Sequence, residues 1–348
     1  MARETHTIQL GQKKPTYTPE ERAAWRQEQE ELCKTRIMEV AKNWETDPKD
    51  VAEYAAFQSR FHTYSTRNMM MIFAQNPNAL FLASFQRFKE MGWPVKKGEH
   101  GMKILVPHKA DCYQTATGQW LPVSKAPKEI KQRIRTGDLP TRKMVVGFGF
   151  GTVFDIAQTS CPREEYPKLI GLGYTSEQHA QVYEAVKEYC ETQGYPVIEL
   201  QESTATLRGR YNPKTHEIHI NPMLGDTQKL NTLLHEMAHG LLLPTAEQSL
   251  AQSTSRKEFE ADALSIMLNT ACGVEVPDTR KEHLAHHYKA YVAELQAAGK
   301  DVSPDALFQP VTDMYQRHIE PLQAHIQAVL SPSQAPSFEP EPEPVSPI

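Results

Sequence analysis

The spacing of apolar residues predicts helices in the first quarter of the chain. Thr18 and Glu21 mark a typical helix start: a threonine cap, a proline directly after it and a glutamate three residues after the cap. Apolar residues at helical spacing continue to about Trp44 and recur over 51–57. These two segments therefore predict helices, and 69–74 is an apolar run closed by Asn76 and Pro77.

Residues 83–165 combine short strands with short helices. The apolar pattern there, interrupted by glycine and proline, predicts a short helix over 85–91, a strand over 103–106 and a hairpin over 113–123. A basic, poorly periodic stretch over 125–142 follows, and 144–154 is expected to be one strand or a bent pair of strands. This first module is therefore expected to be mixed α+β.

The second half of the chain is mainly helical. Ser176 is expected to cap a helix that reaches about Gln193. A strand over 197–202 and a hairpin of 206–211 with 217–221 follow, because polar and apolar residues alternate in the second arm. Four further helices are predicted, over 226–243, 256–272, 279–298 and 303–330.

These patterns predict an α+β fold in two domains. The first domain is expected over 16–165, and Gly171-Leu172-Gly173 lies in a linker over 166–175. A small domain over 176–330, with a metal-binding helix and an antiparallel edge hairpin, follows. Residues 1–15 and the Pro- and Glu-rich segment 331–348 are expected to be disordered tails, because neither can form an apolar core.

Charge divides the chain in the same way. Residues 1–170 carry 26 Lys+Arg against 19 Asp+Glu, whereas the remainder carries 12 against 24, although the net charge is only −5. The stretch 54–150 is the most basic, with 15 Lys+Arg against 5 Asp+Glu. Basic charge gathered in one module is expected for binding a polyanion such as nucleic acid; a lysine-rich solvated surface is the alternative.

Composition excludes several classes of protein. No run of 18 or more apolar residues exists, and the first residues lack the apolar stretch of a secretory signal. The five cysteines are scattered and never form a Cys-x-x-Cys pair, so neither a disulfide framework nor a cysteine zinc site is expected. We therefore expect a cytoplasmic protein without membrane contact; its oligomeric state is open.

His235-Glu236-Met237-Ala238-His239 is the strongest chemical motif. Histidines four residues apart lie on one helical face, so both rings can reach one metal ion, and zinc is the expected ion. Glu236, next to the first histidine, is placed to take a proton from the attacking water and is the predicted catalytic residue. An apolar stripe around the motif indicates a helix seated in a core.

A third ligand is expected on the next helix, because catalytic zinc takes three protein ligands and keeps one position open. Glu258 lies 19 residues after His239, which leaves room for a loop and a returning helix. Asp262 lies one turn beyond Glu258 and is expected to accept a hydrogen bond from a ligand histidine. Glu260 is the competing ligand, but it lies nearly opposite Glu258 on the helix.

Other histidines compete weakly with this site. His283, His286 and His287 cluster on a later helix, where we expect a solvated face. His216 and His219 flank the strand before the zinc helix. That strand is expected to form the edge of the active-site cleft, able to pair with an extended peptide. A surface position is expected for its histidines, and contact with substrate is the alternative for His219.

The second domain resembles the ImmA/IrrE-type metallopeptidases, which are gluzincin-like. Members carry His-Glu-x-x-His followed by a helix with Glu-x-Glu-Ala-(Asn/Asp), which reads Glu258-Phe259-Glu260-Ala261-Asp262 here. In similar gluzincin helices the first glutamate binds zinc. The resemblance therefore implies a zinc-dependent metallo-endopeptidase with His235, His239 and Glu258 as ligands.

The first domain resembles the single-stranded-DNA-binding domain of ArdC-type antirestriction proteins and their LtrC-like relatives. Three segments carry the resemblance: 64–68 (Tyr-Ser-Thr-Arg-Asn), 92–99 (Gly-Trp-Pro-Val-Lys-Lys-Gly-Glu) and 153–159 (Val-Phe-Asp-Ile-Ala-Gln-Thr). Sequence-tolerant binding of single strands needs basic groups for phosphates and aromatic faces for bases. The predicted DNA contacts, aromatic and polar or basic, are Tyr64, Arg67, Asn68, Arg87, Trp93, Lys96, Lys97 and Lys103.

The leading hypothesis is a mobile-element antirestriction protein that binds single-stranded DNA and carries a zinc metallopeptidase domain. Two alternatives remain open. One is a site-specific protease that cleaves a repressor or another regulatory protein of the element. The other is a DNA-binding protein whose zinc is structural. The partners expected are single-stranded DNA and a peptide or protein substrate whose sequence is open.

Overall fold

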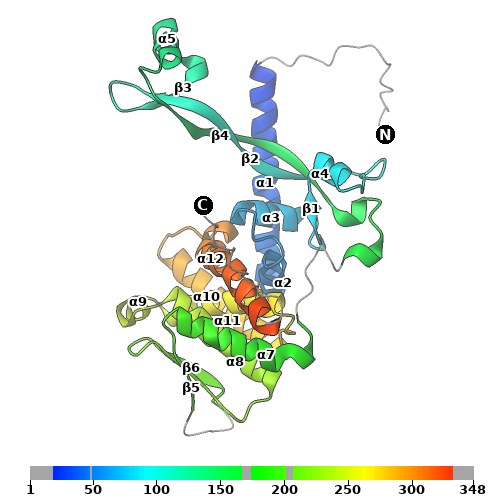
Figure 1. Cartoon of the computed structure of the whole chain (residues 1–348), viewed down its shortest axis with the longest axis vertical. Coiled ribbons are helices and arrows are strands. Elements are labelled where there is room, and N and C mark those ends of the chain that lie inside the picture. Colours follow the sequence, from blue (N-terminus) through cyan, green and yellow to red (C-terminus); the bar gives the residue numbers. More distant parts are fainter. Residues whose placement is uncertain (1–18, 48, 167–173, 201–206, 332–348) are drawn as a thin grey trace, which may run out of the picture. The chain divides into compact units, whose positions relative to one another are not determined.

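The computed structural model describes residues 19–47, 49–166, 174–200 and 207–331. The chain forms two compact units, each made of two separate segments (Figure 1). The first unit comprises residues 1–37 and 103–152, and the second comprises residues 38–102 and 153–348. We call residues 103–152 the ribbon.

The ribbon is a long antiparallel hairpin that carries a short helix. Strand β2 (Met102–Gln114) pairs with β3 (Trp120–Pro122), and the turn between them includes Gly118 at a φ of 81°. A 3-10 turn, η1 (Val123–Lys125), leads to α5 (Lys128–Thr136), and strand β4 (Thr141–Asp155) returns beside β2. The full sheet order is β1-β4-β2-β3.

Helices of the first quarter of the chain fold into the second unit. Helix α1 (Pro19–Thr46) enters it at residue 38 and is followed by α2 (Lys49–Gln58) and α3 (Thr66–Gln75). The Ser65 hydroxyl caps α3 by accepting the backbone N–H of Asn68. The unit also holds α4 (Phe85–Glu90) and the two-residue strand β1 (Leu82–Ala83), which pairs with the end of β4.

The remaining helices of the second unit lie together in Figure 1. They are α7 (His179–Thr192), α8 (Asp226–Leu242), α9 (Ala246–Ala251), α10 (Thr254–Ala271), α11 (Asp278–Ala297) and α12 (Pro304–Leu330). A small sheet of order β5-β7-β6 accompanies them, built from β5 (Val197–Glu199), β6 (Gly209–Asn212) and β7 (Glu217–Ile220). Strand β5 runs parallel to β7, and β6 runs antiparallel to it.

An aromatic cluster joins the early helices to the late ones. Trp44 of α1 packs on Phe308 of α12 with 5.8 Å between ring centroids, and Tyr54 of α2 packs on the same ring at 5.0 Å. Phe308 also meets Phe259 of α10 at 5.3 Å. All four rings are fully buried. The compact units therefore cut across the division at residues 165–176 expected from sequence.

Most predicted elements are present, with differences in detail. The α+β class is confirmed, and the four late helices begin and end within two residues of the predicted bounds. The stretch 125–142 contains helix α5, which buries none of its residues and therefore shows no apolar stripe. Residues 1–15, most of the linker and nearly all of 331–348 lie outside the described residues. No described helix is long and apolar enough to span a membrane.

Candidate metal and active site

Helix α8 holds the two motif histidines on one face. Leu230, Leu233 and Leu234 are fully buried and seat the helix in the core. The rings of His235 and His239 stand one turn apart, with 4.7 Å between their centroids. Both side chains are largely buried, at 10% and 16% exposed. The local sequence therefore places both imidazole rings close together on one face of α8.

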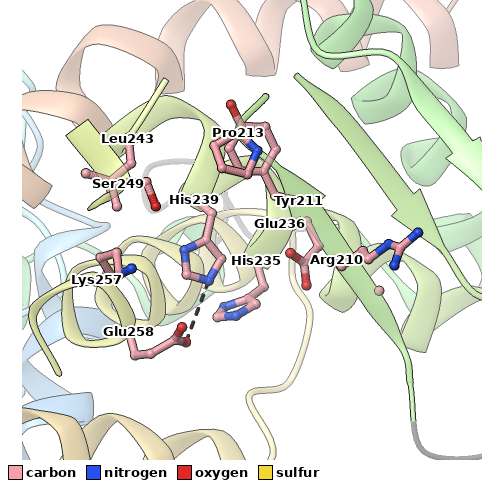
Figure 2. A pocket seen from close by; sticks show the side chains of 11 residues that line it. Arg210, Tyr211, Pro213, His235, Glu236, His239, Leu243, Ser249, Lys257 and Glu258 are labelled. Atoms are coloured by element: carbon pink, nitrogen blue, oxygen red, sulfur yellow. Dashed lines mark ion pairs between the residues drawn. The ribbon is translucent and has the colours of Figure 1, made fainter. Parts of the chain in front are cut away.

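Helix α10 brings Glu258 to the same point. The Ser253 hydroxyl caps α10 by accepting the backbone N–H of Arg256, which fixes the start of the helix. The Glu258 carboxylate lies 3.6 Å from His239 Nε2 (Figure 2). One ligand atom from each of His235, His239 and Glu258 lies within 4.8 Å of the others. This set of two nitrogens and one carboxylate fits a catalytic zinc site.

Glu260, the competing ligand, is engaged elsewhere. Its side chain is 3% exposed and its Oε1 accepts a hydrogen bond from Arg256 Nε at 2.8 Å. It does not belong to the group of described residues whose ligand atoms converge. A spacing of two residues on a helix puts the two glutamates on different faces, as expected from the sequence.

Asp262 lies beside His235 and connects it to α11. Its Oδ1 lies 3.4 Å from His235 Nδ1, and its carboxylate is fully buried. Arg280 donates to the same Oδ1 at 2.7 Å and stands 2.9 Å from His235 Nδ1. His283 lies 2.5 Å from Asp262 Oδ2. The expectation of a wholly solvated histidine face on α11 is therefore wrong for His283, because α11 packs on α10 here.

Glu236 borders a cavity of about 360 Å³ that also contains the converging ligand atoms. The cavity is lined by residues from α8, α10, β6 and the segments beside them: Gly209, Arg210, Tyr211, Pro213, His235, Glu236, His239, Leu243, Ser249, Lys257 and Glu258 (Figure 2). Burial raises the pKa of Glu236 above its usual value. A carboxylate with a raised pKa beside a metal-binding face is suited to accept and return a proton.

Gly209 explains how β6 approaches Glu236. A Cβ at this position would lie 2.6 Å from Thr232 Cγ2 and 3.3 Å from Glu236 Cγ. Only glycine leaves room for the strand to pass this close to α8. The backbone N–H of Tyr211 then donates a hydrogen bond to Glu236.

Charges in the site depend on each other. Burial, reinforced by Arg280, lowers the pKa of His235 well below its usual value. Burial acts in the same direction on His239, but its hydrogen bond to Glu258 and the negative charges of Glu236, Glu258 and Asp262 together raise its pKa. The same bond lowers the pKa of Glu258 against the effect of burial. The lowered pKa of His235 favours its neutral form, which is the form that binds a metal ion.

Strand β7 does not form the edge that the sequence predicted. It is the central strand of its sheet, and β6 is the strand that borders the cavity. His219 pairs with Glu217 at 3.3 Å and does not line the cavity. Sequence reasoning also missed Tyr211 and Arg280, because neither lies at a spacing that links it to the histidine motif.

Several predicted DNA contacts are already engaged within the second unit. Arg67 forms an ion pair with Asp305 at 2.9 Å, although its side chain is 61% exposed. Asn68 is buried within α3, at 8% exposed, and the backbone carbonyl of Tyr64 accepts a hydrogen bond from Gln316. Trp93 packs against the small core around Phe88. The structure therefore offers Asn68 and Trp93 poorly to a ligand.

The basic residues predicted to contact DNA are more accessible. Arg87 is 66% exposed and lies 3.7 Å from Glu90. Lys96 and Lys97 are exposed, and Lys96 Nζ donates to the carbonyl of Ala157 at 3.2 Å. Lys103 belongs to the ribbon, where its Nζ donates to Thr152 Oγ1 at 2.8 Å. Lys103 belongs to the first compact unit, whereas the other three belong to the second.

Two family models match the chain. Residues 27–148 match the N-terminal domain of anti-restriction factor ArdC, and residues 190–298 match the IrrE N-terminal-like domain, a peptidase family. The second match contains the converging residues His235, His239 and Glu258. The ImmA/IrrE and ArdC resemblances inferred from the motifs are confirmed, in the expected order.

Individual relatives are more distant. An uncharacterised protein of Bacillus anthracis, pXO2-81, is 27% identical over 304 residues, which cover 83% of this chain and 50% of that protein. The chain thus spans about half the length of this curated relative. Two crystal structures of antirestriction protein ArdC from the R388 plasmid, one metal-free and one bound to Mn(II), are 18% and 17% identical. Each covers 76% of this chain and 85% of the solved chain, with TM-scores of 0.45 and 0.41. The chain therefore contains a segment that matches the ArdC N-terminal domain, followed by a segment that matches the IrrE-like peptidase domain.

Proposed function

We propose that the chain is a metal-dependent endopeptidase that also binds single-stranded DNA and acts in antirestriction. The observation that carries the peptidase half is the convergence of His235, His239 and Glu258 within 4.8 Å, beside Glu236 in one cavity. The DNA-binding half is supported by the ArdC N-terminal match and by the basic charge of residues 54–150.

His235, His239 and Glu258 would hold the metal, for which zinc is our choice because two imidazoles and a glutamate are a known catalytic zinc set. The bound metal would activate water and polarise the peptide carbonyl. The three residues border a cavity large enough for part of a peptide. A structural zinc site is normally closed by four protein ligands, so an open three-residue site favours catalysis.

Glu236 would carry the proton through the reaction. Its carboxylate accepts a proton from the attacking water and returns it to the leaving amine nitrogen. Its raised pKa suits both steps, because the group must be able to hold the proton between them. The Tyr211 N–H fixes the carboxylate on the cavity side of α8.

The substrate would bind as an extended strand along β6. Among the described strands, β6 pairs only with β7, so its other edge is available for hydrogen bonds to a peptide. Residues 209–211 of this strand line the cavity, which places the edge beside Glu236. The peptide sequence would be selected by side chains around the cavity.

The Glu236→Gln variant tests the peptidase function. We expect loss of cleavage of fluorescently labelled casein by the zinc-loaded full chain, with zinc binding retained because Glu236 is not a ligand. Glu247→Gln, on α9 outside the cavity, is the matched control and should cleave normally. Equal cleavage by wild type and Glu236→Gln would refute the mechanism.

Protection of incoming DNA against restriction in cells separates the alternatives. If Glu236→Gln still protects, DNA binding suffices and the peptidase serves another purpose. If protection is lost and a cleaved host or element protein appears only with wild type, proteolysis carries the function. Both experiments use the full chain, because α2 and α3 pack on the late helices and residues 1–170 are not one compact unit.

A further inference from the structure

An exposed aromatic side chain lies in the middle of the ribbon. Phe148 of β4 is 61% exposed, and Val146, two residues earlier, is 46% exposed. Residues two apart on a strand lie on the same face, so the two side chains form one apolar patch. Apolar patches left open to water within a basic surface are typical of binding sites.

The hydrogen bonds and glycines of the ribbon show which residues share that face. Lys103 of β2 donates to Thr152 of β4, so odd-numbered side chains of β2 share a face with even-numbered ones of β4. The opposite face gives the same register independently. A Cβ on Gly149 would overlap the His108 ring, and one on Gly151 would lie 2.8 Å from Val106.

The face that carries Phe148 therefore also carries Lys109 and Asp111 from β2 and Arg142 from β4. Both basic side chains are exposed. Neither forms an ion pair among the described residues. The whole ribbon carries nine Lys+Arg against three Asp+Glu. Helix α5 contributes four of these basic residues and buries none of its side chains.

We infer that this ribbon face, formed by Lys109, Arg142, Val146 and Phe148, is the surface on which single-stranded DNA binds. The inference rests on the proposed DNA-binding function and locates it. Lys109 and Arg142 contact phosphates, and a base stacks on the Phe148 ring. Duplex DNA cannot offer such a base, because its bases already stack on each other inside the helix.

The placement of the sequence-predicted contacts agrees with this choice. Arg67 is paired with Asp305, Trp93 packs on a core and Asn68 is buried. The ribbon, in contrast, offers an accessible aromatic ring and basic groups on one face. Charge complementarity and the exposed ring together favour a single-stranded nucleic acid over an acidic protein, which would need no stacking partner.

The test measures binding of a fluorescein-labelled oligo(dT) of about 20 nucleotides to the full chain across a range of salt concentrations, since OB-type sites take up to about 16 nucleotides. Phe148→Leu, which keeps an apolar side chain but removes the ring, should weaken binding roughly 5- to 100-fold without changing the salt slope. Phe148→Tyr should bind within about 2-fold of wild type, because it keeps the ring. Lys109→Gln and Arg142→Gln should each lower the slope of the logarithm of the binding constant against the logarithm of the salt concentration by about 0.7.

Controls separate this inference from the general function. Phe85→Leu, at another phenylalanine that is 53% exposed but lies on α4, should bind normally. If Phe148→Leu binds oligo(dT) as tightly as wild type, the ribbon site is refuted, but the proposed DNA-binding function is not. Equal competition by poly-glutamate also overturns the stacking contact. No binding of oligo(dT) by wild type at low salt refutes the DNA-binding function itself.

Discussion

Removing the Phe308 ring should destabilise the second unit strongly. The side chain is fully buried, and three rings surround it: Trp44 at 5.8 Å, Tyr54 at 5.0 Å and Phe259 at 5.3 Å between centroids. Phenylalanine-to-alanine changes in cores cost about 3–5 kcal/mol, and each ring pair contributes about 0.5–1.5 kcal/mol of such a loss. Because the substitution removes all three ring pairs at once, we expect Phe308→Ala to cost about 4–5 kcal/mol.

Urea unfolding followed by circular dichroism at 222 nm measures this loss. Leu250→Ala is the control, because that leucine is 84% exposed and its removal should change the free energy of unfolding by less than about 0.5 kcal/mol. A double-mutant cycle with Trp44→Ala isolates the contact between α1 and α12. We expect a coupling energy of about 0.5–1.5 kcal/mol.

A coupling energy near zero would refute the packing of the early helices on the late ones. A loss of unfolding free energy below about 1 kcal/mol for Phe308→Ala would also refute this packing, because removing a buried phenylalanine ring costs more than that. Either result would mean that the ArdC-type helices and the peptidase helices fold separately. The measured coupling therefore tests the division into compact units directly.

Three further predictions concern the metal site and its surroundings. Glu258→Gln should weaken zinc affinity roughly 100-fold or more, whereas Glu260→Gln should weaken it by less than about 10-fold, because only the Glu258 carboxylate belongs to the converging set. Competition with a chromogenic chelator measures both affinities. The hydrogen bond to Asp262 raises the pKa of His283, so its stabilising effect is present below the ordinary histidine pKa and is lost as pH rises through the raised value. His283→Asn should therefore lower the melting temperature more at about pH 5.5 than at about pH 9. Burial raises the pKa of the Cys272 thiol to about 12, so it should react with a disulfide reagent only when urea unfolds the chain.

The sequence predicts the local part of the candidate site well. His235 and His239 follow from helical periodicity alone, since four residues make about one turn. Glu258 follows from the need for a third ligand on a returning helix, and the fold places its carboxylate beside His239. Each of these inferences depends on spacing within one helix or across one short loop.

The remaining parts depend on long-range packing that spacing does not encode. Arg280 reaches His235 only because α11 packs on α10, and nothing near Arg280 in the sequence indicates this. The exposure of Phe148 is equally hidden, because a valine- and phenylalanine-rich strand usually indicates a buried one. Only the three-dimensional pairing of β2 with β4 shows which face stays open.

The position of Glu258 links the two family domains physically. The next residue, Phe259, packs on Phe308, and that ring contacts Trp44 and Tyr54 from the region matched by the ArdC domain. Helix α10 is thus held on one face by the early helices, while Glu258 faces the cavity. A rigid third ligand requires a fixed helix, because small displacements at a catalytic site reduce activity strongly. The early helices therefore contribute to the geometry of the proposed metal site, so the peptidase region should not be treated as an independent module in this chain.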